Sequence, residues 1–364
     1  MRLSLDAVEP EINRLWTEES KKAPTTRVQL LTLAALVSEP GLLERAEKVL
    51  DGVVRVYPSR TILAVWRDGS SPSITADASL HRAAGSPCGD AISLEAMGSA
   101  REWLPENIDR LALPDLPVCV WWVGDLPDFD DLFDRMVVGA DLVVVNSGEM
   151  DLRDLEKLSR IAQRSHGRYA VTDLTWIRLR PMQDFVARFF DDEAARQALT
   201  KLQRIVIEYS PRANDQDAAS TIAGLFFGWM AHALALRPEA ALWKRGSDFS
   251  EVTLGDVSVR FQHKVREGVL PGRIVGLAIE CQDARFDLEM QADADLFKLS
   301  RDLPGVPMPP QLLRVPSHDE HTLLVRSLER PKRDPLFEAS LHAGSRIVRS
   351  VAPRLSMGPR PPGR

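Results

Sequence analysis

Apolar runs alternate with amphipathic stretches through the first 165 residues, and this order limits the fold more than any other feature. Stretches with the spacing of amphipathic helices separate the runs. Such runs are typical of strands that helices cover on both faces of a parallel sheet. The order therefore predicts an α/β N-terminal domain with an open, mostly parallel sheet. The predicted strands are 28–37, 61–66, 113–124 and 142–145, and the predicted helices are 5–20, 42–50, 98–110, 128–138 and 152–162.

Two further segments of the first half, 74–80 and 91–94, have alternating character and are parted by Gly85-Ser86-Pro87. They predict a hairpin-like insertion. A β-like run at 205–209 and an apolar helix at 216–236 come before a change of pattern to alternating segments at 252–261, 273–281 and 285–290, joined by short turns. Consecutive alternating strands favour an antiparallel sheet with one solvated face.

The second half is therefore predicted to be an α+β C-terminal domain with an antiparallel sheet. Its helices are expected at 193–202, 216–236 and 319–351. A chain of 364 residues suits two domains. We place an α/β domain at 1–170, an α+β domain at 171–352, and a flexible Pro/Gly/Arg tail at 353–364.

Composition excludes some classes of partner. A formal charge of −6 and a pI near 5.7 argue against nucleic-acid binding, which needs a basic surface. Residues 218–236 contain no charged side chain, but Ser220, Thr221 and His232 favour a buried core helix over a membrane span. No apolar signal segment starts the chain, so a cytoplasmic location is expected.

Three widely spaced cysteines, Cys88, Cys119 and Cys281, form no pair with redox or zinc spacing. Buried free thiols in a reducing cytoplasm are the simpler interpretation, and a redox switch is the alternative.

Residues 173–181, Asp-Leu-Thr-Trp-Ile-Arg-Leu-Arg-Pro, join the two halves. Pro181 fits the first turn of a helix, where its missing N–H breaks no hydrogen bond. The residues after it form an apolar stripe at helical spacing. We therefore predict a strand end, a polar link, and then a helix that starts near Pro181. The stripe consists of Met182, Phe185, Val186, Phe189 and Phe190.

The usual catalytic and phosphate-binding motifs are missing from the sequence, including Gly-x-Gly-x-x-Gly, the Walker loop, Gly-x-Ser-x-Gly and His-Glu-x-x-His. Two clusters have weak metal-binding character: the acidic residues of 125–134 and His318-Asp319-Glu320-His321. Capped helix starts explain both more simply. No metal site and no cofactor are predicted.

Two further features allow alternative roles. Ser59 and Arg60 enter a predicted strand and have the donors for a phosphate, although a structural salt bridge is the simpler role for the arginine. Trp121 and Trp122 are adjacent in a strand, so their side chains should lie on opposite faces of the sheet. Trp122 lies beside Gly124 near the strand's end and suits a ligand crevice or a protein interface as well as core packing.

Taken together, these motifs resemble the glucose-6-phosphate dehydrogenase assembly protein (OpcA) family over residues 28–240. The most specific is the 173–181 stretch, where the family shows Asp-Leu-Ser-Trp-Thr-Arg-Leu-Thr-Pro before an aromatic helix. This chain has Tyr57 where the family has His, Asn146 where it has Asp, and Met182-Gln183 where it has Trp-Arg. The other matching motifs are 58–62, 113–122, 140–147 and Phe190-Asp191.

The resemblance implies a non-catalytic, cytoplasmic assembly factor or allosteric activator that binds glucose-6-phosphate dehydrogenase in the oxidative pentose phosphate pathway. Neither nucleic acid nor a membrane is an expected partner, and homo-oligomerisation is open. An α/β enzyme or sensor that binds a phosphorylated sugar is the alternative. The resemblance makes one motif the candidate for partner binding or for the domain junction: Asp173, Trp176, Arg178 and Pro181. A second candidate patch, for phosphate or for the partner, consists of Ser59, Arg60 and Trp122.

Overall fold

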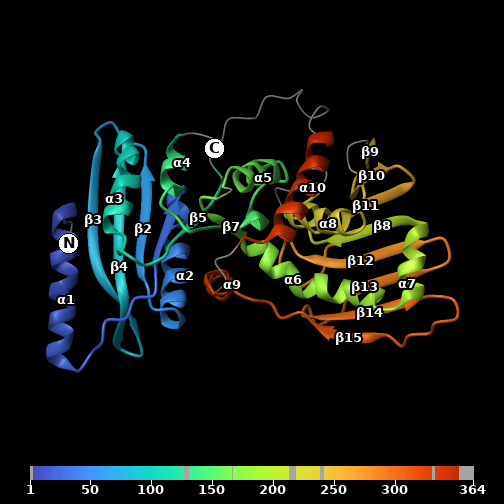
Figure 1. Cartoon of the computed structure of the whole chain (residues 1–364), viewed down its shortest axis with the longest axis horizontal. Helices are drawn as coiled ribbons and strands as arrows, with labels where there is room; N and C mark the ends of the chain where they lie inside the picture. The colour runs from blue at the N-terminus through green and yellow to red at the C-terminus, as the bar shows by residue number, and fades with distance from the viewer. Residues whose placement is uncertain are drawn as a thin grey trace. The chain divides into compact units, whose positions relative to one another are not determined.

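The computed structural model describes residues 3–126, 131–165, 167–212, 219–237, 242–329 and 333–351. The chain forms two compact units, and each is assembled from segments far apart in the sequence (Figure 1). The domain border predicted between residues 170 and 171 stays a prediction, and the predicted tail at 353–364 lies outside the described residues. Unit 1 contains Met1–Asn146, Ile161–Ile177 and His318–Asp334, and unit 2 contains Ser147–Arg160, Arg178–Ser317 and Pro335–Arg364.

Unit 1 is built on a seven-stranded sheet with the order β3-β4-β2-β1-β5-β6-β7. All neighbours pair in parallel except β3 and β4, which form the predicted hairpin. Because β4 also pairs with β2, the hairpin extends the sheet and is not a separate insertion. The predicted mostly parallel sheet is confirmed. Its strands are β1 Thr32–Val37, β2 Arg60–Arg67, β3 Ser73–Ala83, β4 Ser86–Met97, β5 Val118–Val123, β6 Leu142–Val145 and β7 Ala170–Asp173.

One face of this sheet packs against α2 and α9, with Leu50 of α2, Leu324 of α9 and Trp121 of β5 in a single buried cluster. The Trp122 ring lies 5.2 Å from that of Phe133 in α4, so the two tryptophans face opposite sides of the sheet, as predicted. The α9 segment lies far from β1 in the sequence, and nothing in its pattern indicates that it returns to this sheet. Helices within unit 1 are α1 Val8–Lys22, α2 Leu43–Val56, α3 Leu104–Leu111, α4 Asp131–Val137 and α9 Glu320–Leu328.

Unit 2 is built on an eight-stranded sheet with the order β15-β14-β13-β12-β8-β11-β10-β9. Only β8 and β11 pair in parallel, so the predicted antiparallel sheet is confirmed in its main character. The single segment predicted at 252–261 is wrong: Gly255, with φ +60°, turns the chain between two strands. The strands are β8 Leu202–Tyr209, β9 Leu242–Arg245, β10 Phe249–Leu254, β11 Val257–His263, β12 Ile274–Cys281, β13 Arg285–Met290, β14 Leu296–Asp302 and β15 Gln311–Arg314.

Aromatic rings fill the core of unit 2. Phe189 lies 5.4 Å from Phe286, and Phe227 lies 5.8 Å from Phe261, measured between ring centroids. Among the residues that the structure describes, no helix combines the length and the apolar character needed to cross a bilayer. The remaining α-helices are α7 Glu193–Ala198, α8 Thr221–Ala233 and α10 Pro335–Val351 within unit 2, and α5 Asp154–Arg164 and α6 Leu174–Ala187, which each run from one unit's residues into the other's.

The backbones of α8 and α10 touch at the glycines of α8. A Cβ atom on Gly228 would lie only 2.1 Å from the carbonyl oxygen of Ser340. We expect Gly228→Ala to lower the free energy of unfolding by about 1–3 kcal/mol, because a backbone cannot move aside cheaply. Gly224→Ala is the matched control, since its Cβ would meet the end of the flexible Leu152 side chain at 2.6 Å. Equal urea midpoints for the two variants would contradict this account of the contact.

Candidate functional site

The junction motif starts with a helix cap. Asp173 is the last residue of β7, and its Oδ1 accepts the backbone N–H of Thr175 at 3.0 Å. An aspartate in this position satisfies a free N–H at a helix start, so α6 begins at Leu174, directly after the strand. The predicted polar link and the predicted helix start near Pro181 are therefore wrong, because Pro181 lies inside α6.

Pro181 weakens α6 where the helix leaves unit 1. Proline has no N–H, so the carbonyl of Ile177 loses its helical partner. Ile177 is the last residue of unit 1 in this helix, and Arg178 is the first residue of unit 2. The backbone defect in α6 and the border between the units thus fall within one turn of each other.

Trp176 is fixed within unit 1. Its side chain is 2% exposed, and its Nε1 donates a hydrogen bond to Oδ2 of Asp334 at 2.9 Å. Asp173 is fully buried, and Arg178 is half-buried. The structure therefore brings Asp173 and Trp176 together at the start of α6, in a buried setting.

A polar network adjoins this helix start. Thr175 Oγ1 donates to Asn146 Oδ1 at 3.0 Å, and Asn146 Nδ2 donates to Glu320 Oε1 at 3.4 Å. Arg45 donates two hydrogen bonds to the same carboxylate, at 2.6 and 2.7 Å. In the sequence, Asn146 stands out only as a departure from the family pattern. The partners Arg45 and Glu320 are 275 residues apart, so no local signal could have joined them.

This network lies at the carboxyl edge of the unit 1 sheet, where parallel sheets bind ligands. Asn146 follows β6 and Asp173 ends β7. The order of strands changes direction between β1 and β5, and there Ser38 Oγ donates to the Val123 carbonyl at 3.2 Å. A Cβ on Gly124 would lie 2.5 Å from that hydroxyl. At these positions the chain's own polar groups hydrogen-bond to one another.

The second candidate patch is dispersed and buried. Ser59 is fully buried and donates its hydroxyl to the Tyr57 carbonyl at 2.7 Å. Arg60 is 2% exposed and bonds to Asp90, Glu9 and the Leu111 carbonyl, so the guanidinium has the role of a structural salt bridge.

Trp122 does not join Ser59 and Arg60. It is 2% exposed, and its Nε1 donates to the Asp125 carbonyl at 2.9 Å. Arg60 begins its strand, whereas Trp122 lies one residue before the end of β5. The strands are parallel, so the two side chains lie toward opposite ends of the sheet.

Each cluster weighed as a metal site includes an aspartate with a structural partner, and Asp134 forms an ion pair with Arg164 at 2.8 Å. Asp319 caps α9 by accepting the N–H of Thr322 at 3.1 Å. The pKa of this aspartate is lowered first by the side-chain hydroxyl of Thr322 and further by that backbone N–H. Among the described residues, no group of three or more metal-ligating side chains converges. Asp128 and Asp130 lie outside the described residues.

Cys119 and Cys281 are buried, and Cys88 is partly buried. Burial raises the pKa of Cys119 to about 12 and that of Cys281 to about 11, and it also raises the pKa of Cys88. All three are free. Reactive thiols usually have a lowered pKa, so these environments favour the simpler interpretation of inert thiols.

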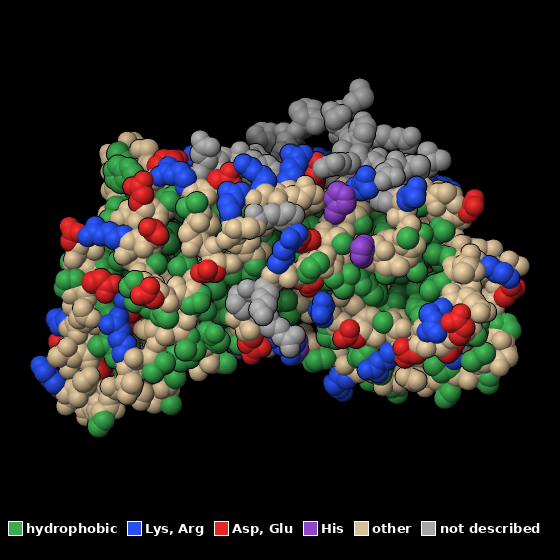
Figure 2. Space-filling view, viewed as in Figure 1, with side chains coloured by type: hydrophobic (Ala, Val, Ile, Leu, Met, Phe, Trp, Pro, Cys, Tyr) green, Lys and Arg blue, Asp and Glu red, His purple; other side chains and the backbone are tan. Residues whose placement is uncertain are grey.

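Charges are mixed on the described surface. Figure 2 shows lysine and arginine side chains interspersed with aspartate and glutamate on the visible face, with hydrophobic side chains between them. This face has no broad field of one sign, which agrees with the modest net charge of −6.

Two protein-family profiles match the chain. The profile described as the glucose-6-phosphate dehydrogenase subunit N-terminal domain, OpcA, matches residues 51–163, and that of the C-terminal domain matches residues 169–341. The chain belongs to the OpcA family. The junction motif 173–181 lies near the start of the second matched region.

Curated OpcA relatives agree with this assignment. The OxPP cycle protein OpcA of Synechocystis sp. is 30% identical over 159 residues, which is 44% of this chain and 32% of the relative. The protein of the same name from Nostoc punctiforme is 27% identical over 209 residues, which is 54% of this chain and 42% of the relative. The matches thus span less than half of the length of these relatives.

Two of the solved structures to which the chain is similar are oxidoreductases by name. The 3-ketoreductase KijD10 of Actinomadura kijaniata has a TM-score of 0.49 and 12% identity, covering 88% of this chain and 96% of its own. A levoglucosan dehydrogenase has a TM-score of 0.49 and 9% identity, covering 90% of this chain and 98% of its own. Function does not follow from resemblance of this kind.

Proposed function

We propose that this OpcA-family chain is a non-catalytic, cytoplasmic partner of glucose-6-phosphate dehydrogenase that promotes its assembly or activity in the oxidative pentose phosphate pathway. The observation that carries the proposal is the match of two profiles named for a subunit of that enzyme, over residues 51–163 and 169–341. The names of the curated relatives point to the same pathway. Neither a nucleic acid nor a membrane is proposed as a partner.

The carboxyl edge of the unit 1 sheet supports a role without catalysis. Arg45, Glu320, Asn146 and Thr175 hydrogen-bond to one another there, within 2.6–3.4 Å. An enzyme that uses this edge needs polar groups directed at its substrate. Here these groups are directed at one another, as in a scaffold.

Activation by such a partner requires a difference in affinity. A protein shifts an equilibrium between two forms of an enzyme only if it binds one form more tightly than the other. A tenfold preference for the active oligomer corresponds to about 1.4 kcal/mol. We propose that the chain acts in this way, and that the junction motif supports it by shaping the start of α6 through the Asp173 cap and the buried Trp176.

An activity titration tests the proposal. The dehydrogenase of the same organism is assayed at fixed concentration while the purified chain is added. We expect a saturable change in KM or kcat, which the heat-denatured chain does not produce. No change in either parameter, together with separate elution of the two proteins on gel filtration, would contradict it.

The rival function predicts a different result. A sugar-phosphate enzyme or sensor would show a higher melting temperature with glucose 6-phosphate alone, in the absence of any dehydrogenase. The burial of Ser59 and Arg60 and the carboxylate partners of that arginine argue against such a site at this position.

A further inference from the structure

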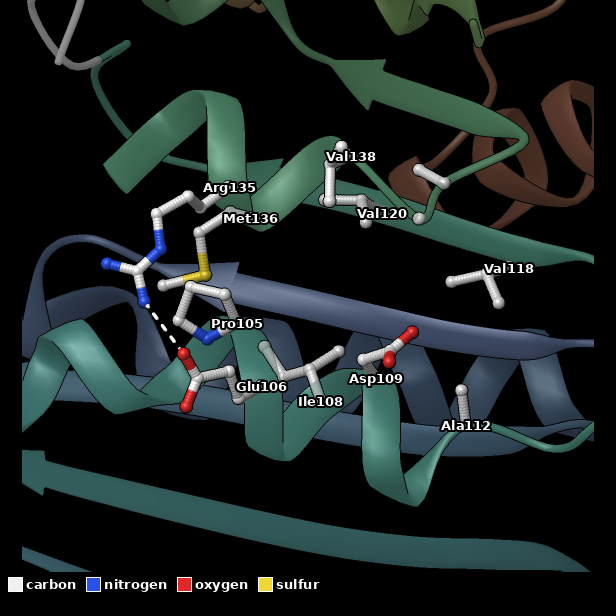
Figure 3. A pocket seen from close by; sticks show the side chains of 12 residues that line it. Pro105, Glu106, Ile108, Asp109, Ala112, Val118, Val120, Arg135, Met136 and Val138 are labelled. Atoms are coloured by element: carbon white, nitrogen blue, oxygen red, sulfur yellow. Dashed lines mark hydrogen bonds and ion pairs between the residues drawn. The ribbon is translucent and has the colours of Figure 1, made fainter. Parts of the chain in front are cut away.

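Unit 1 has a groove between α3 and α4 that none of the roles above uses. Its floor is β5, and Figure 3 shows side chains of α3 and α4 facing each other across it. The apolar lining includes Ile108, Val120 and Met136, which are 4%, 1% and 5% exposed. Val138, just beyond the end of α4, stands at the rim with 69% of its surface exposed.

The groove has the size of one large apolar side chain. Its volume is about 180 Å³, and an apolar cavity of about 150 Å³ holds a benzene ring. A small-molecule site would need several converging polar groups, whereas the floor of this groove is formed by aliphatic side chains. An aromatic or aliphatic anchor from another protein suits it better, because such anchors in pockets dominate interface energies.

The two ends of the groove differ in charge. At one end Arg135 bonds to Glu106 at 3.3 Å and to Glu102 at 3.2 Å, so its charge is balanced (Figure 3). At the other end Asp109 is exposed, and its side-chain carboxylate has no hydrogen bond or ion pair to any residue that the structure describes. A Cβ on Gly139 would lie 3.4 Å from Asp109 Oδ1, which places this carboxylate at the lip of the groove.

We infer that this groove is the docking site for a protein segment that inserts one large apolar side chain and places a neighbouring lysine or arginine against Asp109. The unpaired Asp109 carboxylate favours a basic residue in the bound segment. The volume of the groove allows only one large apolar side chain to enter. The segment belongs to glucose-6-phosphate dehydrogenase, an assignment that rests on the proposed function.

Two variants test the inference, each with a matched control on unit 1. Val138→Asp puts a charge at the apolar rim, and Val56→Asp does the same at the end of α2, where valine is 64% exposed. Asp109→Lys reverses the charge at the lip, and Asp68→Lys reverses an exposed aspartate that has no partner among the described residues. All four positions are solvent-exposed, so the folded state is expected to persist, which melting curves check.

Binding is measured as the Kd between the full chain and the dehydrogenase by isothermal calorimetry. We expect Val138→Asp and Asp109→Lys each to raise Kd by about tenfold or more, and the two controls to leave Kd within about twofold of the wild type. Higher salt should weaken wild-type binding more than binding by Asp109→Asn, since an exposed charge pair is screened.

The outcomes separate this inference from the proposed function. If the wild type binds the dehydrogenase and both groove variants bind as tightly, the docking site is wrong and the proposed function stands. A wild type that does not bind overturns both. Groove variants that alter self-association in sedimentation, while leaving dehydrogenase binding unchanged, also overturn the inference, because the groove then holds a second copy of the chain.

Discussion

Replacing Asp90 with alanine is expected to lower the free energy of unfolding by about 3–5 kcal/mol, the cost of breaking a buried ion pair from one side. Asp90 is fully buried. It accepts hydrogen bonds from Arg60 Nε at 3.0 Å, Arg27 Nη2 at 2.5 Å and Trp16 Nε1 at 2.7 Å. The variant removes the buried carboxylate that pairs with the Arg60 guanidinium, which is 2% exposed. It also removes the hydrogen bond from Trp16 that joins α1 to the sheet.

Urea unfolding followed by circular dichroism measures this loss. Asp68→Ala is the control, because this exposed aspartate has no partner among the described residues, and its effect should stay within about 0.5 kcal/mol. A loss below about 1 kcal/mol in Asp90→Ala would show that the network is not a main support of unit 1. Asp90→Asn keeps the shape and removes the charge, and we expect it to be the milder change.

Trp176→Ala is expected to cost about 3–5 kcal/mol, the usual loss when a buried tryptophan is truncated. The side chain is 2% exposed, and its Nε1 bonds to Asp334 at 2.9 Å. Trp176→Phe removes the N–H and keeps most of the packing, so about 1 kcal/mol is expected. Trp103→Ala, at an indole that is 46% exposed, is the control and should change stability little.

The same variants test the role of the junction motif. Activation of the dehydrogenase is measured per folded molecule, below the melting temperature of each variant. If Trp176 supports activation by shaping α6, Trp176→Ala should activate less than Trp103→Ala even where both are fully folded. Normal activation by folded Trp176→Ala would show that the indole serves stability alone.

Sequence analysis predicted the two sheets because each has a strong pattern. Continuous apolar runs such as 61–66 mark strands covered on both faces, and alternation such as 285–290 marks strands with one polar face. These patterns depend only on which residues of a strand are buried, so they can be recognised without knowing which strands or helices pack against it. The opposite facing of Trp121 and Trp122 followed from strand geometry alone.

The errors arose where a local signal competed with another. Pro181 is a strong marker of a helix start. However, Asp173 caps the helix at an earlier position by accepting the N–H of Thr175. The helix therefore begins before the proline and contains it. The alternating pattern continues on both sides of Gly255 and therefore predicted one strand there. The structure has a tight turn at this glycine, whose positive φ suits such a turn.

Contacts between distant segments were beyond sequence patterns. The sequence favours a structural salt bridge for Arg60 over a phosphate contact, but it cannot name the carboxylate partners, because Glu9 and Asp90 are 51 and 30 residues away. The network of Arg45, Asn146 and Glu320 spans 275 residues. The groove between α3 and α4 likewise depends on how the two helices pack over β5, so the sequence of either helix alone does not predict it.

Sedimentation velocity of the dehydrogenase with and without this chain tests the central claim most directly. The account predicts a faster-sedimenting species that contains both proteins, with the dehydrogenase shifted toward one oligomer at concentrations where it is otherwise a mixture. An unchanged distribution, in which the two proteins sediment as separate boundaries at micromolar concentration, would contradict it.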